Sequence, residues 1–458
     1  MAAFSEEQAA AIPIQPVAVD TLEAALSALP EAQRNWAKAL GFEAKGGSTA
    51  LLAGENGTLV RVLAGTGKEV GIDACWSLAG LARSLPPQVY RLDDDTIDAD
   101  AFALAWGLGG YSFQRYRTQD RKPVPTLVHA LGDDTVAMLE AVTVTRDLIN
   151  TPASDLGPTA LEAACRKLAE HHGAHITSVT GDDLLAQNYP MVHAVGRASR
   201  DAPRVIDMVW GKEDAPKITL VGKGVTFDTG GLNIKPGAAM GLMKKDMGGA
   251  ANVLGLAHMI MARQLPVRLR VIIGAVENAI SGNAFRPGDV LQTRNGMTVE
   301  IGNTDAEGRL VLGDCLTLAD EEAPDVLVDM ATLTGAARVA LGPELAPLFT
   351  DDDAFADALS LAGKAVHDPL WRMPLWAPYQ KMLASKVADV NHISTGPFGG
   401  SITAALFLSR FVKNAKTWAH FDIFGWVPSD RPWAKTGGEA FAIRALFTVL
   451  KDRYPPVT

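Results

Sequence analysis

The feature that most constrains this chain is an alternation of apolar runs and helix-length stretches after Pro158. Runs rich in β-branched residues, typical of strands, lie at 205–209, 218–221, 267–275, 326–331 and 418–424. Stretches that predict helices lie at 161–171, 238–263, 310–321, 402–413 and 441–452. Strands joined by connections of this length pair mainly in parallel, and helices then cover both faces of the sheet. The pattern predicts an α/β fold whose ligands bind beyond the carboxyl ends of the strands.

The domain organisation follows from length and from proline positions. A chain of 458 residues accommodates about three domains of roughly 150 residues, or two of uneven size. Helices at 20–28 and 74–85 and strands at 50–52 and 59–63 predict a smaller N-terminal α/β domain. Pro123 and Pro125 disfavour helix, and the periodic stretch 133–150 predicts a connecting helix that Pro152 ends. We therefore expect an N-terminal domain at 1–131, a connecting helix and linker at 132–158, and a C-terminal domain at 159–458.

Charge, cysteine content and the N-terminus narrow the class of protein. Lys and Arg number 42 and Asp and Glu 52, and the net charge of −10 makes nucleic acid an unlikely partner. Cys75, Cys165 and Cys315 are odd in number and lack CxxC spacing, which favours a reducing cytoplasm over a disulfide framework. The N-terminus is acidic and has no signal-peptide pattern. The apolar stretch 101–113 is too short to cross a membrane, so we expect a soluble cytoplasmic protein.

A glycine-rich segment follows the predicted strand at 218–221 and carries Lys223 and Asp228. It matches neither a Walker A phosphate loop nor a dinucleotide fingerprint, because neither spacing is present. One interpretation is that the glycines let the backbone crowd around an ion held by Asp228. The alternative is an ordinary tight turn, and this segment alone does not decide between the two.

A second segment places Asp246 early in the predicted helix 238–263, followed by a methionine and four of the smallest side chains. Small residues allow a helix to approach its neighbour closely, so Asp246 is expected to have low exposure. A carboxylate in such surroundings needs a cation or several hydrogen bonds. The alternative is a charge that complements the dipole at a helix N-terminus.

The third segment places Asp305, Glu307 and Arg309 at alternate positions after the predicted strand at 299–301. In an extended segment this spacing directs all three side chains to one side. Two crowded carboxylates repel unless a cation lies between them. The alternative, a solvated turn with a surface ion pair, does not explain why Gly, Ala and Gly are interleaved so closely.

Together the three segments offer four carboxylates at one edge of the predicted sheet: Asp228, Asp246, Asp305 and Glu307. Shared carboxylates suit two divalent ions about 3.5–4 Å apart, such as Mg²⁺, Mn²⁺ or Zn²⁺. Histidine is absent from these segments, and we interpret His171, His172, His175 and His258 as structural or solvated. The chain has no GxSxG elbow, so covalent catalysis has little support.

These segments resemble the leucine aminopeptidase family, the M17 or cytosol aminopeptidases. The resemblance lies in residues 222–231, in 244–251 and above all in the octapeptide Asn-Thr-Asp-Ala-Glu-Gly-Arg-Leu at 303–310. Further similarity runs through 330–335, 371–375 and 400–407, so that it covers roughly residues 140–458. It implies a metal-dependent aminopeptidase that removes N-terminal residues from peptides through a metal-bridged hydroxide.

The resemblance also implies roles for individual residues. The positions that match metal ligands are Lys223, Asp228, Asp246, Asp305 and Glu307. The positions that match catalytic residues are Lys235 and Arg309, with Arg309 holding a bicarbonate that serves as general base. The positions that match substrate-binding residues are Met243, Asn303, Thr332, Leu333 and Gly335, which favour Leu or Met as the released residue. A ligand role requires Lys223 to be deprotonated, whereas Lys235 would stay charged.

Cofactors and partners follow from the same resemblance. It implies two divalent ions per subunit, Mn²⁺ or Zn²⁺ with Mg²⁺ and Co²⁺ as further candidates, and a homohexamer that acts on peptides. It also implies a macro-type α/β fold for the N-terminal domain. Two other functions stay open from the residues alone. A moonlighting DNA-binding regulator conflicts with the net charge of −10, and a two-metal phosphohydrolase would use similar acidic residues.

Overall fold

The computed structural model describes residues 3–7, 10–118 and 123–456. Residues 119–122, beside the predicted domain boundary, lie outside this description. The chain forms two compact units. The first contains Met1–Thr143 together with Ala365–His367 and Val427–Thr436, and the second contains the remaining segments. The rings of Trp76 and His367 stack with centroids 4.7 Å apart, which joins one of the late segments to the first unit.

The first unit is built on a six-stranded sheet with the order β1-β6-β5-β2-β4-β3. Its strands are β1 (Ala3–Ser5), β2 (Ile12–Ala18), β3 (Thr49–Ala53), β4 (Leu59–Gly67), β5 (Val89–Leu92) and β6 (Thr126–Val128). All neighbours are parallel except β3 and β4. Its helices are α1 (Leu22–Ser27), α2 (Glu31–Ala39), α3 (Gly71–Leu78), α4 (Leu81–Ser84) and α5 (Ala99–Gly109).

One element of this unit differs from the sequence-based prediction, and one stretch had no predicted structure. The helix expected at 74–85 is two helices, α3 and α4. The apolar stretch at 101–113 mostly forms α5, whose residues 102–109 are all buried. The Asp98 side chain begins this helix by accepting hydrogen bonds from the backbone N–H groups of Asp100 and Ala101. Within the described part of the chain, none of the helices combines the length and the apolar character that crossing a bilayer requires.

The second unit contains an eight-stranded sheet with the order β15-β14-β17-β13-β9-β10-β8-β7. Its strands are β7 (His175–Thr180), β8 (Arg204–Trp210), β9 (Lys217–Asp228), β10 (Arg268–Asn278), β13 (Val326–Ala331), β14 (Ala346–Phe349), β15 (Leu370–Arg372) and β17 (Trp418–Asp422). The four central strands β17, β13, β9 and β10 are parallel, as predicted. The pairs β14–β17, β10–β8 and β8–β7 are antiparallel, which makes the whole sheet mixed.

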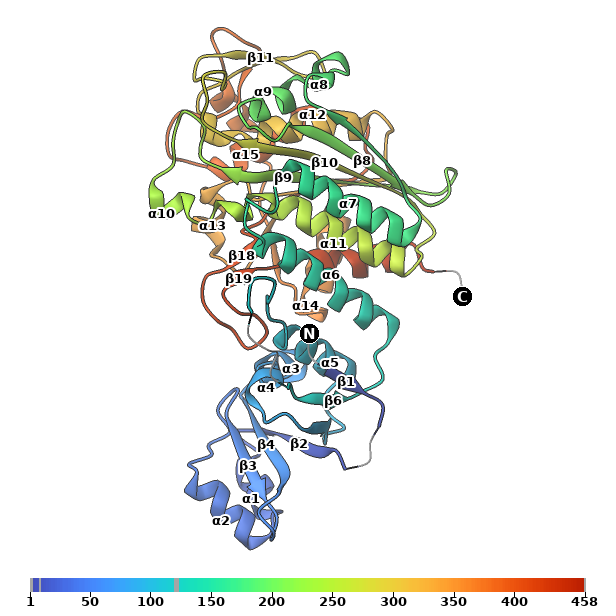
Figure 1. Ribbon diagram of the computed structural model, residues 1–458, viewed down its shortest axis with the longest axis vertical. Coiled ribbons are helices and arrows are strands. Elements are labelled where there is room, and N and C mark those ends of the chain that lie inside the picture. Colours follow the sequence, from blue (N-terminus) through green and yellow to red (C-terminus); the bar gives the residue numbers. More distant parts are fainter. Residues whose placement is uncertain (1–2, 8–9, 119–122, 457–458) are drawn as a thin grey trace. The chain divides into compact units, whose positions relative to one another are not determined.

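Helices cover both faces of this sheet (Figure 1), with α7 and α11 on one face and α9, α12 and α15 on the other. α6 (Asp133–Asn150) leads from the first unit into the second. The helices of the second unit are α7 (Pro158–His172), α8 (Asp183–Ala186), α9 (Pro190–Gly196), α10 (Gly237–Met240), α11 (Gly248–Ala262), α12 (Gly308–Asp320), α13 (Gly335–Leu341), α14 (Asp353–Ala365), α15 (Gly400–Leu408) and α16 (Ile443–Arg453). Two covered faces explain why the central strands are mainly apolar.

Short elements complete the fold. A three-stranded sheet joins β11 (Val290–Gln292), β12 (Thr298–Glu300) and β16 (Val390–Asn391), and β18 (Trp426–Val427) pairs with β19 (Gly437–Gly438). The 3-10 helices are η1 (Met243–Met247), η2 (Thr304–Ala306), η3 (Ala377–Leu383) and η4 (Ser409–Phe411).

The strand predicted to end at residue 221 continues as β9 to Asp228, so Lys223 lies within the strand and not past its end. Its glycines explain the difference, because they permit close packing. A Cβ atom on Gly222 would stand 2.6 Å from the Cα of Ala250 in α11, and one on Gly224 would stand 2.7 Å from the Gly274 carbonyl oxygen. Residues 222–228 of the glycine-rich segment therefore belong to a strand that packs closely against helix α11 and strand β10.

Two other predictions about local structure were wrong. The helix expected at 238–263 is broken into α10, η1 and α11, and Asp246 lies in the 3-10 turn that precedes α11. The segment 305–309 is not extended, because it consists of η2 followed by the first turn of α12. Both segments are turns at helix beginnings, where backbone direction changes within a few residues and periodicity gives no signal.

Candidate metal centre

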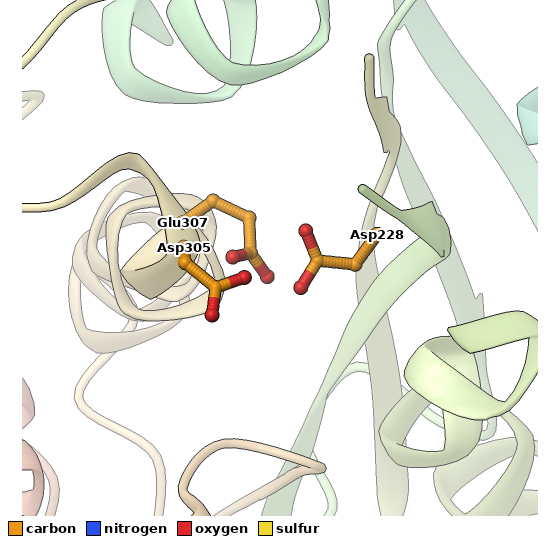
Figure 2. Close-up of side chains that lie close together, drawn as sticks. All are labelled: Asp228, Asp305 and Glu307. Atoms are coloured by element: carbon orange, nitrogen blue, oxygen red, sulfur yellow. The ribbon is translucent and has the colours of Figure 1, made fainter. Parts of the chain in front are cut away.

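Three carboxylates converge beyond the carboxyl end of β9. One oxygen from each of Asp228, Asp305 and Glu307 lies within 4.8 Å of the others. Figure 2 shows Asp228 at the end of its strand and the other two side chains reaching it from the opposite turn and helix. Thus the acidic residues expected at one sheet edge do meet there, although they come from a strand end, a 3-10 turn and a helix N-terminus.

Asp246 belongs to the same group through Lys223. The Lys223 Nζ atom lies 2.7 Å from Asp246 Oδ2 and 3.0 Å from Glu307 Oε1. Thr332 holds Asp246 from the other side, because its hydroxyl donates to Asp246 Oδ1 at 2.8 Å. A Cβ on Gly308 would stand 2.7 Å from Lys223 Nζ, so this glycine makes room for the lysine. We call Asp228, Asp246, Asp305 and Glu307 the acidic cluster.

Lys235 joins the remaining two members of the acidic cluster. Its Nζ atom lies 2.8 Å from Asp228 Oδ2 and 2.5 Å from Asp305 Oδ1. Each lysine thus lies between two carboxylates, and four negative charges face two positive ones. The lysine pair therefore offsets half of the four carboxylate charges, and the nearby charge of buried Lys245 also acts on Asp246.

The pKa values follow from burial and from this crowding. Burial raises the pKa of all four carboxyl groups, and repulsion from a neighbouring acid adds to it at each. Burial alone would lower the pKa of Lys223 and of Lys235, but the surrounding carboxylates outweigh it and raise both. The chain by itself therefore holds both lysines as ammonium groups. A ligand role for Lys223 requires an arriving dication to displace that proton.

The donor set fits divalent ions. Buried oxygens of Asp246, Asp305 and Glu307 accept no well-aligned hydrogen bond from any residue that the structure describes, although lysine Nζ atoms lie at ion-pair distance. Buried carboxylate oxygens without such donors are costly unless a cation compensates them. Oxygen donors carrying this much charge suit Mg²⁺, Mn²⁺ or Zn²⁺.

Sequence reasoning missed Asn278 and Thr304, which support the cluster. Asn278 Nδ2 donates to Asp228 Oδ1 at 2.8 Å and to the Thr304 carbonyl at 3.0 Å. Asn278 ends β10 at the position that pairs with Asp228 of β9. A polar residue at the end of a neighbouring apolar strand was the signal that could have identified it.

Arg309, predicted to be catalytic, lies in the first turn of α12 and is buried. Its Nη1 group donates to the His392 carbonyl at 2.7 Å, while its Nε group has no hydrogen-bond partner among the described residues. Burial lowers the pKa of Arg309 to about 10, which leaves the guanidinium charged at neutral pH. The negative charge of Glu307 acts to raise the pKa of Arg309. No hydrogen bond or ion pair joins Arg309 to the acidic cluster in the part of the chain described.

The residues predicted to bind substrate are distributed around the cluster. Thr332 contacts Asp246 directly, and its carbonyl accepts a hydrogen bond from Lys223 Nζ at 2.9 Å. The Leu333 N–H donates to Asp422, another buried acid that sequence reasoning missed. The remaining three begin turns or helices: Met243 begins η1, Gly335 begins α13 and Asn303 caps η2. A Cβ on Gly335 would have no heavy atom of the described chain within 4 Å apart from its chain neighbours and its own helix backbone, so there is open space at this residue.

Comparison with known proteins adds to this geometry. Residues 143–447 match the model of the cytosol aminopeptidase family, catalytic domain, and residues 12–128 match that of the M17 aminopeptidase N-terminal domain. The chain belongs to the cytosol aminopeptidase family. It is therefore an enzyme of the metallo-exopeptidase class of hydrolases, as the sequence resemblance predicted.

Individual members of the family resemble the chain over most of its length. A probable cytosol aminopeptidase of Roseiflexus castenholzii is 41% identical over 383 residues, which cover 79% of this chain and 78% of the relative. A second one, from Sinorhizobium medicae, is 40% identical over 427 residues, which cover 86% of this chain and 85% of the relative.

Two solved structures have the same fold. The crystal structure of cytosol aminopeptidase from Coxiella burnetii superposes with a TM-score of 0.94 at 46% identity and covers 98% of both chains. The bottromycin maturation enzyme BotP, solved in complex with Mn, gives a TM-score of 0.87 at 32% identity over 97% of this chain and 100% of BotP. The predicted two-domain α/β architecture is confirmed.

Proposed function

We propose that this aminopeptidase depends on two divalent ions, Mn²⁺ or Zn²⁺ foremost, held by the acidic cluster and Lys223. The observation that carries the proposal is the excess of carboxylates over lysines at a buried site, with oxygens that lack aligned donors. The manganese in the BotP complex supports the choice of ion, because BotP has a similar fold. Two bound ions would supply Lewis-acid chemistry that polarises a peptide carbonyl and activates water.

The two lysines have different roles in this proposal. Lys223 lies within β9, is enclosed by Gly308 and the acidic cluster, and would offer a lone pair once its proton is displaced. Lys235 is less buried and follows the strand in a loop, where its ammonium would stay charged. An ammonium in that position can stabilise the oxyanion that forms when the peptide carbonyl is attacked.

Arg309 would hold bicarbonate as the general base. The supporting observation is a buried guanidinium whose Nε group has no partner among the described residues. A buried cation with an unused donor suits a small planar anion. In this arrangement Arg309 orients the anion, and the anion receives the proton that water loses.

The substrates proposed are peptides with an apolar first residue such as Leu or Met. Met243 and Gly335, with Thr332 between them and the cluster, would line a mainly apolar space for that side chain. We further propose a homohexamer in the cytoplasm, on the basis of the family resemblance alone.

One assay separates this function from the two-metal phosphohydrolase. The protein is loaded with Mn²⁺ and given leucyl p-nitroanilide, leucyl peptides and p-nitrophenyl phosphate in parallel. We expect release of the amino acid from the first two substrates and no turnover of the phosphate ester. Hydrolysis of the phosphate ester alone would overturn the proposal.

A further inference from the structure

His392 was not among the predicted site residues, yet it is completely buried and lies against the turn that carries Asp305. It directly follows β16, which pairs with β12 at Glu300 and Asn391. The His392 backbone N–H donates to the Glu300 carbonyl at 3.2 Å and extends this pairing by one residue. The short sheet thereby delivers the imidazole to the segment that connects β12 with η2.

The hydrogen bonds of the ring define its tautomer. His392 Nε2 lies 2.9 Å from the Asn303 carbonyl oxygen, which only accepts hydrogen bonds, so Nε2 carries a proton. Nδ1 lies 3.2 Å from the Glu300 carbonyl oxygen and 3.2 Å from the Gly302 nitrogen. Because the contact of Nε2 with Asn303 is the shorter one, we assign the proton to Nε2, and the Gly302 N–H group then donates to Nδ1. Burial and the charge of Arg309 lower the pKa of His392 to about 3, in agreement with a neutral ring. The imidazole is thus a fixed bridge, with one donor and one acceptor used on the same turn.

Asn303 stabilises this turn through both its carbonyl group and its side chain. The Asn303 carbonyl receives His392 Nε2–H and also the Ala306 N–H at 3.2 Å. The Asn303 side chain accepts the Asp305 N–H at 2.8 Å, which caps the beginning of η2. Rotation of the 303–304 peptide would therefore displace the Asp305 carboxylate, and the imidazole prevents that rotation.

The same residue also holds Arg309. The His392 carbonyl accepts a hydrogen bond from Arg309 Nη1 at 2.7 Å, and this is the hydrogen bond that the structure records for the guanidinium. One residue therefore contacts the beginning of the ligand-bearing turn with its ring and the guanidinium in α12 with its backbone. Because the ring and the carbonyl belong to one residue, the distance between these two contacts is restricted.

We propose that His392 is a positioning residue that fixes the Asp305 turn and the Arg309 guanidinium relative to each other. This inference rests on the proposed function, in which Asp305 binds metal and Arg309 holds the general base. It assigns the imidazole no contact with substrate and no proton transfer. Outer residues that orient metal ligands typically contribute 10- to 100-fold to metal affinity or activity.

Three substitutions separate the hydrogen bonds of the ring from its volume. His392→Gln places an amide N–H₂ near the Nε2 position and can still donate to Asn303. His392→Asn places an oxygen near Nδ1 and can still accept from Gly302, but it is too short to reach the Asn303 carbonyl. His392→Phe fills the space and makes neither hydrogen bond. His193→Gln is the matched control, since His193 lies on α9 and pairs with the exposed Asp182, which precedes α8.

Metal affinity of the apo full-length protein is measured by Mn²⁺ titration calorimetry, and kcat and KM are measured on leucyl p-nitroanilide. We expect His392→Phe and His392→Asn to lose about 10- to 100-fold in Mn²⁺ affinity or kcat with little change in KM. His392→Gln should stay within a few-fold of the parent, like the His193→Gln control. Circular dichroism and the unfolding midpoint verify that each variant is folded.

Parent-like Mn²⁺ affinity and kcat in folded His392→Phe would overturn the inference. Equal losses in all three variants would overturn it as well, since the hydrogen bond to Asn303 that His392→Gln keeps would then make no difference. If His392→Phe does not fold, the comparison of His392→Gln with His392→Asn decides in the same way. A parent protein that binds Mn²⁺ but releases no amino acid would refute the proposed function, while the calorimetric comparison would still test His392.

Discussion

The second unit buries charge in two very different ways. In the pair Arg146–Glu439, Arg146 Nε donates to Glu439 Oε1 at 2.9 Å and Nη2 donates to Oε2 at 2.8 Å. One positive charge thus meets one negative charge, and each carboxylate oxygen has an aligned donor. In the acidic cluster, four carboxylates meet two lysines, and several oxygens have no aligned donor among the described residues.

The difference between the two regions distinguishes a structural ion pair from a binding site. A buried pair is tolerated when Coulomb attraction and hydrogen bonds compensate desolvation. In the acidic cluster carboxylates outnumber the lysines paired with them, so bound cations would stabilise it. Charge balance and donor alignment identify the site here, because burial alone does not separate Asp228, Asp246 and Glu307 from the Arg146–Glu439 pair.

The largest effect is expected from metal removal, which acts on the acidic cluster alone. Exhaustive chelation should reduce aminopeptidase activity by at least about 10³-fold, because the ions supply several kcal/mol of transition-state stabilisation. Added Mn²⁺ or Zn²⁺ should restore the aminopeptidase activity. The Asp305→Asn variant should also lose metal, because one ligand charge disappears. Metal content by mass spectrometry and rates on leucyl p-nitroanilide check this. Full activity with metal content near zero would contradict it.

The Arg146–Glu439 pair should behave in the opposite manner. Arg146→Met leaves an uncompensated buried carboxylate and should lower the free energy of unfolding by about 3–5 kcal/mol. Urea denaturation measures this, and the double variant Arg146→Met/Glu439→Leu should recover much of the loss. Mn²⁺ affinity and kcat of the folded protein should stay unchanged. A loss of metal in Arg146→Met would remove the distinction between the two regions.

Within the cluster, the two lysines should separate binding from catalysis. Lys235→Met should retain both metals and lower kcat by about 10²–10³, the usual effect of removing one oxyanion donor. Lys223→Met should weaken one metal site, and added metal should partly restore activity. Calorimetry and kcat at saturating Mn²⁺ distinguish the two. If Lys235→Met instead loses a metal while Lys223→Met keeps full occupancy, the assigned roles are reversed.

The smallest effect concerns the uncharged side of the site, near Met243 and Gly335. Peptides that begin with Leu or Met should be hydrolysed with higher kcat/KM than peptides that begin with Asp or Lys. Apolar pockets discriminate by only about 1–3 kcal/mol per methylene. A series of amino-acyl anilides measures the preference. Faster release of acidic or basic residues would show that charge also governs this side.

Much of the fold could be predicted from sequence because its signals are local. The strand at 326–331 and the helix at 133–150 have the predicted bounds, since long periodic or apolar runs report burial directly. The sequence predicted no element at strands β14 and β15 or at helix α9, because these segments are too short to show a clear pattern. The break between α10 and α11 was missed because small residues suit both a helix and the turn that interrupts it.

The sequence by itself determined the chemical identity of the site, that is, which carboxylates and lysines are present. Only the tertiary structure decided the partners. Glu439 meets Arg146 across 293 residues, and His392 reaches Asn303 across 89. The physical reason is that periodicity encodes which face of a segment is buried, whereas charge balance and hydrogen-bond alignment depend on which segments then pack together.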